Sequence, residues 1–188
     1  MIYEFEVVEV YPAEKLHLVA KGLPIPIKQA TKEYQKEVNP KWQSSTTLAS
    51  WNNIIRKKVH LEKVHFRTLM KLTTVAIHTF GKYEKRPTGG RIALINPKVL
   101  RKELDKRDLT AEDFLYDYPD EDRAMFSNVY QMRIVPKVPL LTKLTTWIDD
   151  YDNARFDFPE DPGVRWDIEE WRRTANIKPK ESWEERKD

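Results

Sequence analysis

Cysteine is absent from the 188 residues, and glycine is scarce, with only 5. The absence of cysteine excludes disulfide bonds, thiolate catalysis and cysteine-based zinc sites. It also favours an intracellular location, cytoplasmic by default, with an organelle or a virus particle left open. The scarcity of glycine argues against a phosphate-cradling loop, and neither G-x-x-x-x-G-K-[ST] nor G-x-G-x-x-G occurs. We therefore predict no cofactor.

Long apolar runs are also missing. No stretch approaches the ~20 residues that a membrane span needs, so no membrane partner is predicted. The first residues, Met-Ile-Tyr-Glu-Phe-Glu, lack the basic and apolar regions of a signal peptide. Metalloprotease, serine-hydrolase and EF-hand signatures do not occur. These absences argue against an enzymatic function, and no catalytic residue is predicted.

The net charge of +3 conceals a strong segregation of charge along the chain. Residues 41–107 hold 16 Lys/Arg against 4 Asp/Glu, whereas residues 108–188 hold 12 against 20. A basic middle of this kind indicates a polyanion partner, or a fold in which the acidic third neutralises it. The plainer interpretation is that both regions form solvated faces without a binding role.

Cations recur at steps of three or four through residues 45–82, which contain no proline. At that period they form one stripe on a helix, and apolar residues fall on the opposite side. We predict a long amphipathic helix with a basic outer face, continuous over residues 56–82 and ended by Gly81. The competing interpretation is a break near Val59 followed by a strand, because residues 59–61 and 64–66 alternate at period two.

The complete pattern predicts an α+β fold in which a small antiparallel sheet packs on this basic helix. Strands are expected over residues 2–11, 16–20, 91–95 and 129–135, and helices over residues 27–38, 97–107, 111–118 and 140–151. Thr110, with Asp113 three residues later, predicts a capping box. The predicted domains are a core over residues 1–140 and an acidic, Trp- and Pro-rich extended arm over residues 141–188.

Nucleic acid is the predicted partner of the basic middle, through contacts to the phosphate backbone rather than to base sequence, since no base-reading motif occurs. The aromatic residues Trp42, Trp51 and Tyr83 lie among the cations and could stack on bases. The predicted binding residues are Arg56, Lys57, His60, Lys63, Arg67, Lys71, Lys82, Lys85, Arg86 and Arg91.

Two acidic clusters could hold a hard cation such as Mg²⁺ if their oxygens converge. They are Asp117, Asp120, Glu121 and Asp122, and then Asp149, Asp150 and Asp152. A solvated turn and a charged helix end explain them more simply. The histidines of the middle segment have mostly Lys and Arg as neighbours, which suits contact with phosphate better than metal binding. No metal site is predicted.

A basic, cysteine-free chain with Trp and Pro in its last third is similar in composition to proteins of large assemblies such as ribosomes or virions. The first hypothesis is a non-catalytic structural component that associates with nucleic acid, RNA rather than DNA. The alternatives are a virion or particle assembly protein and a metal-dependent nuclease-like enzyme. In the C-terminal arm, the residues predicted to dock on protein subunits are Trp166, Trp171 and Trp183.

Overall fold

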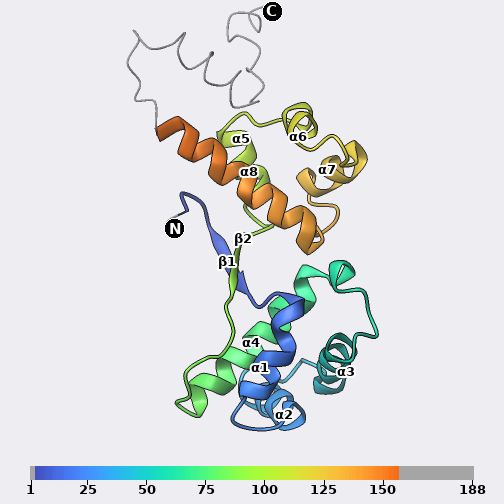
Figure 1. Ribbon diagram of the computed structural model, residues 1–188, viewed down its shortest axis with the longest axis vertical. Helices are drawn as coiled ribbons and strands as arrows, with labels where there is room; N and C mark the ends of the chain where they lie inside the picture. The colour runs from blue at the N-terminus through green and yellow to red at the C-terminus, as the bar shows by residue number, and fades with distance from the viewer. Residues whose placement is uncertain (1–2, 157–188) are drawn as a thin grey trace, which may run out of the picture. The chain divides into compact units, whose positions relative to one another are not determined.

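The computed structural model describes residues 3–156, and within them the chain has an α+β fold that is mostly helical, with one two-stranded antiparallel sheet (Figure 1). These residues form two compact units. The N-terminal unit holds residues 6–97 and 135–144. The C-terminal unit holds residues 3–5, 98–134 and 145–156.

Residues 141–156 of the predicted C-terminal arm belong to helix α8, whereas residues 157–188, with Trp166, Trp171 and Trp183, lie outside the described residues. Their predicted docking role therefore stays a prediction. Within residues 3–156, no helix combines the length and the apolar character that a membrane span requires.

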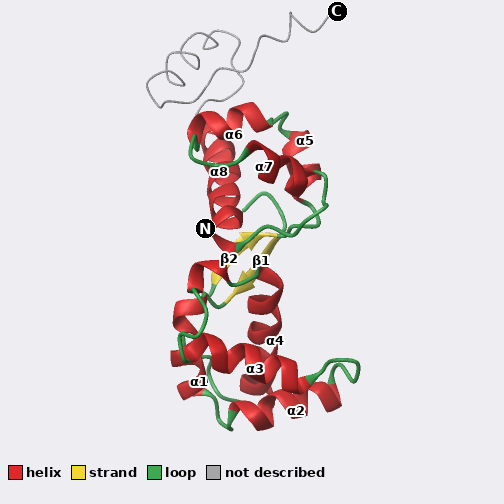
Figure 2. Cartoon of the chain, turned by 90° about the vertical axis from the view of Figure 1, so that its right-hand side faces the viewer, coloured by secondary structure: helices red, strands yellow, loops and turns green. Residues whose placement is uncertain are grey.

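The N-terminal unit is built around one central helix, α4. Its elements in chain order are β1 (Val7–Val10), α1 (Leu16–Gly22), α2 (Ile27–Glu37), α3 (Ser44–Ile55), α4 (Phe66–Lys82) and β2 (Ile92–Ile95). The two strands pair antiparallel, with Val7 opposite Ile95 and Val10 opposite Ile92 (Figure 2). Helix α4 contacts β1, α2 and α3, so the orientation of α4 decides which of its side chains reach solvent.

The apolar sides of α3 and α4 form the core of this unit. Their buried side chains include Trp51, Leu69, Leu72, Ala76 and Phe80. Full burial of one large apolar side chain contributes about 1.5–3 kcal/mol, so this face fixes how α4 is oriented. The amide of Tyr11 donates to Oγ1 of Thr73 at 2.8 Å and ties the end of β1 to the middle of α4. As a result Arg67 and Lys71 of α4 are exposed.

The C-terminal unit consists of helices that surround an aromatic cluster. Its elements are α5 (Leu100–Lys106), α6 (Ala111–Asp117), α7 (Arg123–Tyr130) and the later part of α8 (Val138–Phe156). The ring centroid of Phe114 lies 5.2 Å from that of Phe126 and 5.1 Å from that of Trp147. The predicted capping box of α6 is confirmed, because Thr110 Oγ1 accepts from the amide of Asp113 and the Asp113 carboxylate accepts from the amide of Thr110.

The prediction of one helix over residues 56–82 is wrong. Helix α3 ends at Ile55 and α4 begins at Phe66, with a short 3-10 turn over Leu61–Lys63 between them. The competing interpretation placed the break correctly near Val59, but its strand is wrong because residues 66–82 are helical. Val64 and Phe66 alternate with exposed neighbours because both are buried where the chain enters α4, and not because they belong to a strand.

Two further predicted strands do not form: the first is helical, and the second is the end of a helix followed by a turn. Residues 16–20 lie in α1, where Leu16 and Val19 are buried and Leu18 is 43% exposed. That is helical spacing, which five residues cannot distinguish from alternation. The expected strand over residues 129–135 overlaps α7, whose N-cap is Asp122, with its carboxylate accepting from the amide of Ala124 at 2.7 Å. The predicted helix start at residue 97 is early, since α5 begins at Leu100.

Four helices of the described chain end on a residue other than glycine with positive φ. These residues are Lys57 after α3 (52°), Glu84 after α4 (49°), Asp108 after α5 (50°) and Met132 after α7 (55°). At the end of α3, the amide of Lys57 donates to the Ile54 carbonyl at 3.0 Å and the amide of Lys58 to that of Asn53 at 2.8 Å. This is the Schellman arrangement, which normally uses glycine. The scarcity of glycine thus leaves strain at the helix ends, about 1–2 kcal/mol for each L-residue.

Replacement of Lys57 by glycine should raise the free energy of unfolding by about 0.5 kcal/mol, and so should Glu84→Gly. Each change relieves the left-handed strain, less the conformational entropy that glycine adds to the unfolded chain. Urea denaturation of the full chain measures the effect. Lys58→Gly is the matched control, because Lys58 does not have positive φ and the change should not stabilise. Stability losses at all three positions would contradict the strain argument.

Candidate nucleic-acid interface

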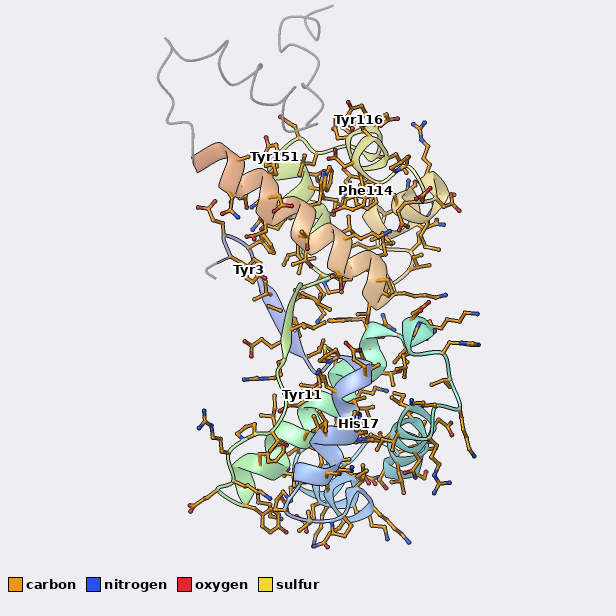
Figure 3. All side chains as sticks on the ribbon, viewed as in Figure 1. Tyr3, Tyr11, His17, Phe114, Tyr116 and Tyr151 are labelled. Atoms are coloured by element: carbon orange, nitrogen blue, oxygen red, sulfur yellow. The ribbon has the colours of Figure 1, made fainter. Side chains whose placement is uncertain are left out.

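The segment that joins α3 to α4 carries a dense group of exposed cations, here called the basic turn: Arg56, Lys57, Lys58, Lys63 and Arg67. Within residues 3–156, none of these five lies within ion-pair distance of a carboxylate. Glu62 is the single acidic residue between positions 56 and 67. Nitrogen-ended side chains project outward along this segment (Figure 3). The basic turn is therefore a concentrated positive surface that no carboxylate of residues 3–156 neutralises.

Apolar anchors hold the basic turn in place from below. Val64 and Phe66 are buried on the α4 side, and Ile54 is buried on the α3 side. His65 forms an isolated antiparallel bridge with Lys137, which brings a further exposed lysine to the turn from a distant part of the chain. Because these anchors are buried on both sides of the turn, the charged side chains between them extend into solvent, as does Val59, which is 38% exposed.

The far end of α4 is electrostatically different. Nζ of Lys82 lies 2.6 Å from a carboxylate oxygen of Glu33 and 2.6 Å from one of Glu37, both on α2. Nε2 of His78 lies 3.4 Å from Glu37. The hydroxyl of Tyr83 donates to Glu33 as well. The structure therefore places Lys82, a predicted binding residue, in an internal charge cluster.

This cluster shifts the pKa values of its two main charged groups, Glu33 and Lys82. The hydrogen bond from Lys82, together with one from Gln29, lowers the pKa of Glu33 from 4.5 to about 2. The hydrogen bonds to Glu33 and Glu37 raise the pKa of Lys82. A carboxylate with a lowered pKa stabilises the fold above its unfolded pKa, and that stabilisation is lost as the pH falls toward the folded value.

A carbon-13 NMR titration should therefore place the midpoint of the Glu33 carboxylate near pH 2, and Lys82→Gln should move it up toward 4.5. Acidification from pH 4.5 to 2 should then destabilise the wild type by more than the variant, since only the wild type loses the ion pair in that window. Lys21→Gln, an exposed change on α1, is the control and should leave the Glu33 midpoint in place. An equal midpoint in wild type and Lys82→Gln would exclude the ion pair.

The basic loop after α4 forms a separate surface. Nη1 of Arg91 lies 2.8 Å from Glu9, so this predicted binding residue is paired, whereas Lys85 and Arg86 are exposed. The loop is held against α1, because a Cβ on Gly22 would lie 1.9 Å from Oγ1 of Thr88. Helix α4 has 17 residues and is about 25 Å long at about 1.5 Å per residue. The ten predicted residues thus do not form one site.

The three candidate stacking residues differ in exposure. Trp51 is fully buried, so its predicted role in base stacking is wrong. Tyr83 is 39% exposed, and its hydroxyl is bound to Glu33. Trp42 is half-buried in the segment before α3, and Nζ of Lys71 lies over its ring, 5.6 Å from the centroid. Trp42 is the aromatic residue best placed to meet a ligand beside the basic turn.

Three of the seven acidic residues considered as metal ligands have other partners. The indole of Trp147 donates to Asp117 at 2.8 Å, and burial raises the pKa of Asp117. Asp152 binds Arg107, and Asp122 caps α7. Among residues 3–156, no three His, Asp or Glu side chains converge as a metal site would require.

Sequence reasoning missed two cations of this surface, Lys58 and Lys137. Lys58 did not fit the predicted stripe, because that stripe assumed a continuous helix through residues that instead form a turn. Lys137 reaches the turn only through the backbone bridge to His65, so no local pattern could have indicated it.

No family model matches this chain, and neither the curated proteins nor the solved structures include a significant match. The geometry of the basic turn is therefore the basis for a functional assignment.

Proposed function

We propose that this chain is a non-catalytic structural component of a larger assembly and associates with nucleic acid through phosphate contacts at the basic turn. The supporting observation is that five neighbouring cations are exposed and that no carboxylate of residues 3–156 pairs with them. Like charges on one short segment repel each other, and an anionic ligand relieves that repulsion. Each phosphate that a cation neutralises also releases condensed counterions.

RNA is the preferred ligand in this proposal, rather than DNA. Trp42 is half-exposed and in contact with Lys71 on the helix that also carries Arg67. Proteins that bind RNA often stack unpaired bases on aromatic side chains, next to cations that hold the backbone. Within the same proposal, the C-terminal arm over residues 141–188 supplies contacts to a protein neighbour through Trp166, Trp171 and Trp183, since aromatic residues are frequent anchors of protein interfaces.

The test is the salt dependence of binding by the full chain. Fluorescence anisotropy with a 20-nucleotide oligouridine should give a linear plot of log affinity against log salt between 50 and 400 mM KCl. Five phosphate contacts predict a slope of about −3.5, at about −0.7 per contact on a single strand. A deoxy strand of matching sequence tests the preference for RNA. A flat plot, or no binding at 50 mM, would overturn the proposal.

A further inference from the structure

A pocket of about 340 Å³ opens on the N-terminal unit beside the basic turn. Residues just before α3, the first half of α3 and the first half of α4 form its walls. The lining includes Lys41, Trp42, Thr46, Ser50, Thr68 and Lys71, and it contains no Asp or Glu. Pockets for small ligands start at about 300 Å³, so this one has room for a single small group rather than for a duplex.

One wall of the pocket is an aromatic ring that is held in place. The ring centroid of Trp42 lies 4.9 Å from that of Tyr34, with the planes inclined by 43°. The backbone amide of Trp42 donates to the Asn39 carbonyl at 3.0 Å. These contacts orient the indole before any ligand arrives, which reduces the entropy that binding would cost.

The cations of the pocket could bind the phosphate of a ligand whose planar group stacks on Trp42. Lys41 and Lys71 are exposed, and within residues 3–156 neither lies within ion-pair distance of a carboxylate. A lysine over an exposed ring contributes less than a stacked base does, so a base can displace the ammonium group of Lys71 from the ring. The flexible lysine stem then lets that group meet the phosphate of the same nucleotide.

The pocket also continues into the basic turn. Arg67 precedes Lys71 by four residues, so both lie on the same side of α4, one turn apart. A strand that places one nucleotide in the pocket can therefore present its next phosphates to Arg67 and to the cations before it. Thr46 Oγ1 donates to the Gln43 side chain and Ser50 Oγ donates to the Thr46 carbonyl, so both hydroxyl oxygens of the pocket lining can accept hydrogen bonds from a base.

We propose that this pocket binds one unpaired nucleotide of a single-stranded RNA, with its base stacked on Trp42 and its phosphate against Lys71 and Lys41. The inference rests on the proposed function and adds to it the position and the class of the ligand. It predicts that the bases of the strand, and not only its charge, contribute to affinity, and that a duplex, whose bases are not free to stack, binds less tightly.

Fluorine NMR of the full chain labelled with 5-fluorotryptophan tests the pocket directly. The chain has six tryptophans, and the Trp42 resonance is identified by its loss in Trp42→Phe. An unpaired decauridine should shift this resonance, whereas an abasic phosphodiester strand of equal length should not. If the abasic strand shifts it equally, or if decauridine binds without shifting it, the pocket proposal is overturned. The titration itself uses the wild-type chain, and Trp42→Phe serves only to assign the resonance.

Affinities of variants provide the second measurement. Trp42→Ala should weaken binding of decauridine by about tenfold, within the range seen when stacking residues are truncated, and leave binding of the abasic strand unchanged. Trp42→Phe should retain most of the affinity. Lys71→Gln should weaken binding of both strands, and Lys36→Gln on α2 serves as its charge-matched control. Absence of binding to either strand would defeat the proposed function itself, whereas equal binding of both strands by wild type and Trp42→Ala would defeat only the pocket.

Discussion

Replacement of Asp152 by alanine should lower the free energy of unfolding of the C-terminal unit by about 3–5 kcal/mol at neutral pH, because it leaves a buried guanidinium without its main partner. Nε and Nη2 of Arg107 each lie 2.6 Å from the Asp152 carboxylate, a bidentate pair. The side chains are 2% and 8% exposed. Nη1 also donates to the Glu103 carboxylate at 2.7 Å, so removal of Asp152 leaves this pair in place.

Burial lowers the pKa of Arg107, but the hydrogen bonds to Asp152 and Glu103 raise it by more, so the guanidinium stays charged in the folded protein. The destabilisation caused by Asp152→Ala therefore comes from a buried charge that has lost its partner, and not from a change in the protonation of Arg107. Hydrogen exchange followed by mass spectrometry locates this destabilisation, because amides of α5 and α8 should exchange about two to four orders of magnitude faster. The double change Arg107→Met with Asp152→Leu should restore most of the protection, because apolar side chains of similar volume replace the pair.

An exposed pair in the same unit is the control for this prediction. Arg123 donates to Glu112 with both side chains well exposed, 69% and 49%. Glu112→Ala should cost no more than about 1 kcal/mol, since water and salt screen a surface pair. If Glu112→Ala and Asp152→Ala had equal effects, burial of the Arg107 pair would not govern its strength.

The sequence predicted the positions of several helices and of the strand β2. Residues 27–38 and 140–151 were expected as helices and correspond to α2 and α8, and the strand at residues 91–95 corresponds to β2. The prediction failed for short segments, because five residues such as those of α1 fit period two and helical spacing equally well. The break between α3 and α4 was ambiguous for a related reason, since the cations keep helical spacing through the turn.

Arg107 illustrates what charge patterns cannot reveal. It counts toward the basic middle in the sequence, yet it is 3% exposed and paired with an aspartate 45 positions later. Two of the predicted binding residues are likewise paired with carboxylates. Lys82 pairs with Glu33 and Glu37, and Arg91 pairs with Glu9. Local composition gives the number of cations, but only tertiary contacts decide which of them remain available to a ligand.

Removal of the basic turn's charge should abolish most of the RNA affinity of the chain. The variant carries Arg56→Gln, Lys57→Gln, Lys63→Gln and Arg67→Gln. If each side chain contacts one phosphate, the slope of log affinity against log salt becomes shallower by about 2.8. At 50 mM KCl the same counterion arithmetic gives a loss of roughly 10³-fold. These side chains are exposed and have no carboxylate partner within residues 3–156, so the fold should keep its stability.

The decisive comparison is a variant of equal net charge whose changes lie elsewhere in the same unit: Lys21→Gln, Lys28→Gln, Lys32→Gln and Lys36→Gln, all exposed on α1 and α2. If only net charge matters, both variants lose affinity equally and the basic turn is not a site. If the turn is the site, the control keeps nearly the full slope. Lys57→Gly and Glu84→Gly refine the comparison, because both should stabilise the fold by relieving positive φ, yet only the first removes a cation. Lower RNA affinity in the more stable Lys57→Gly variant, with none lost in Glu84→Gly, would separate binding from folding at a single residue of the turn.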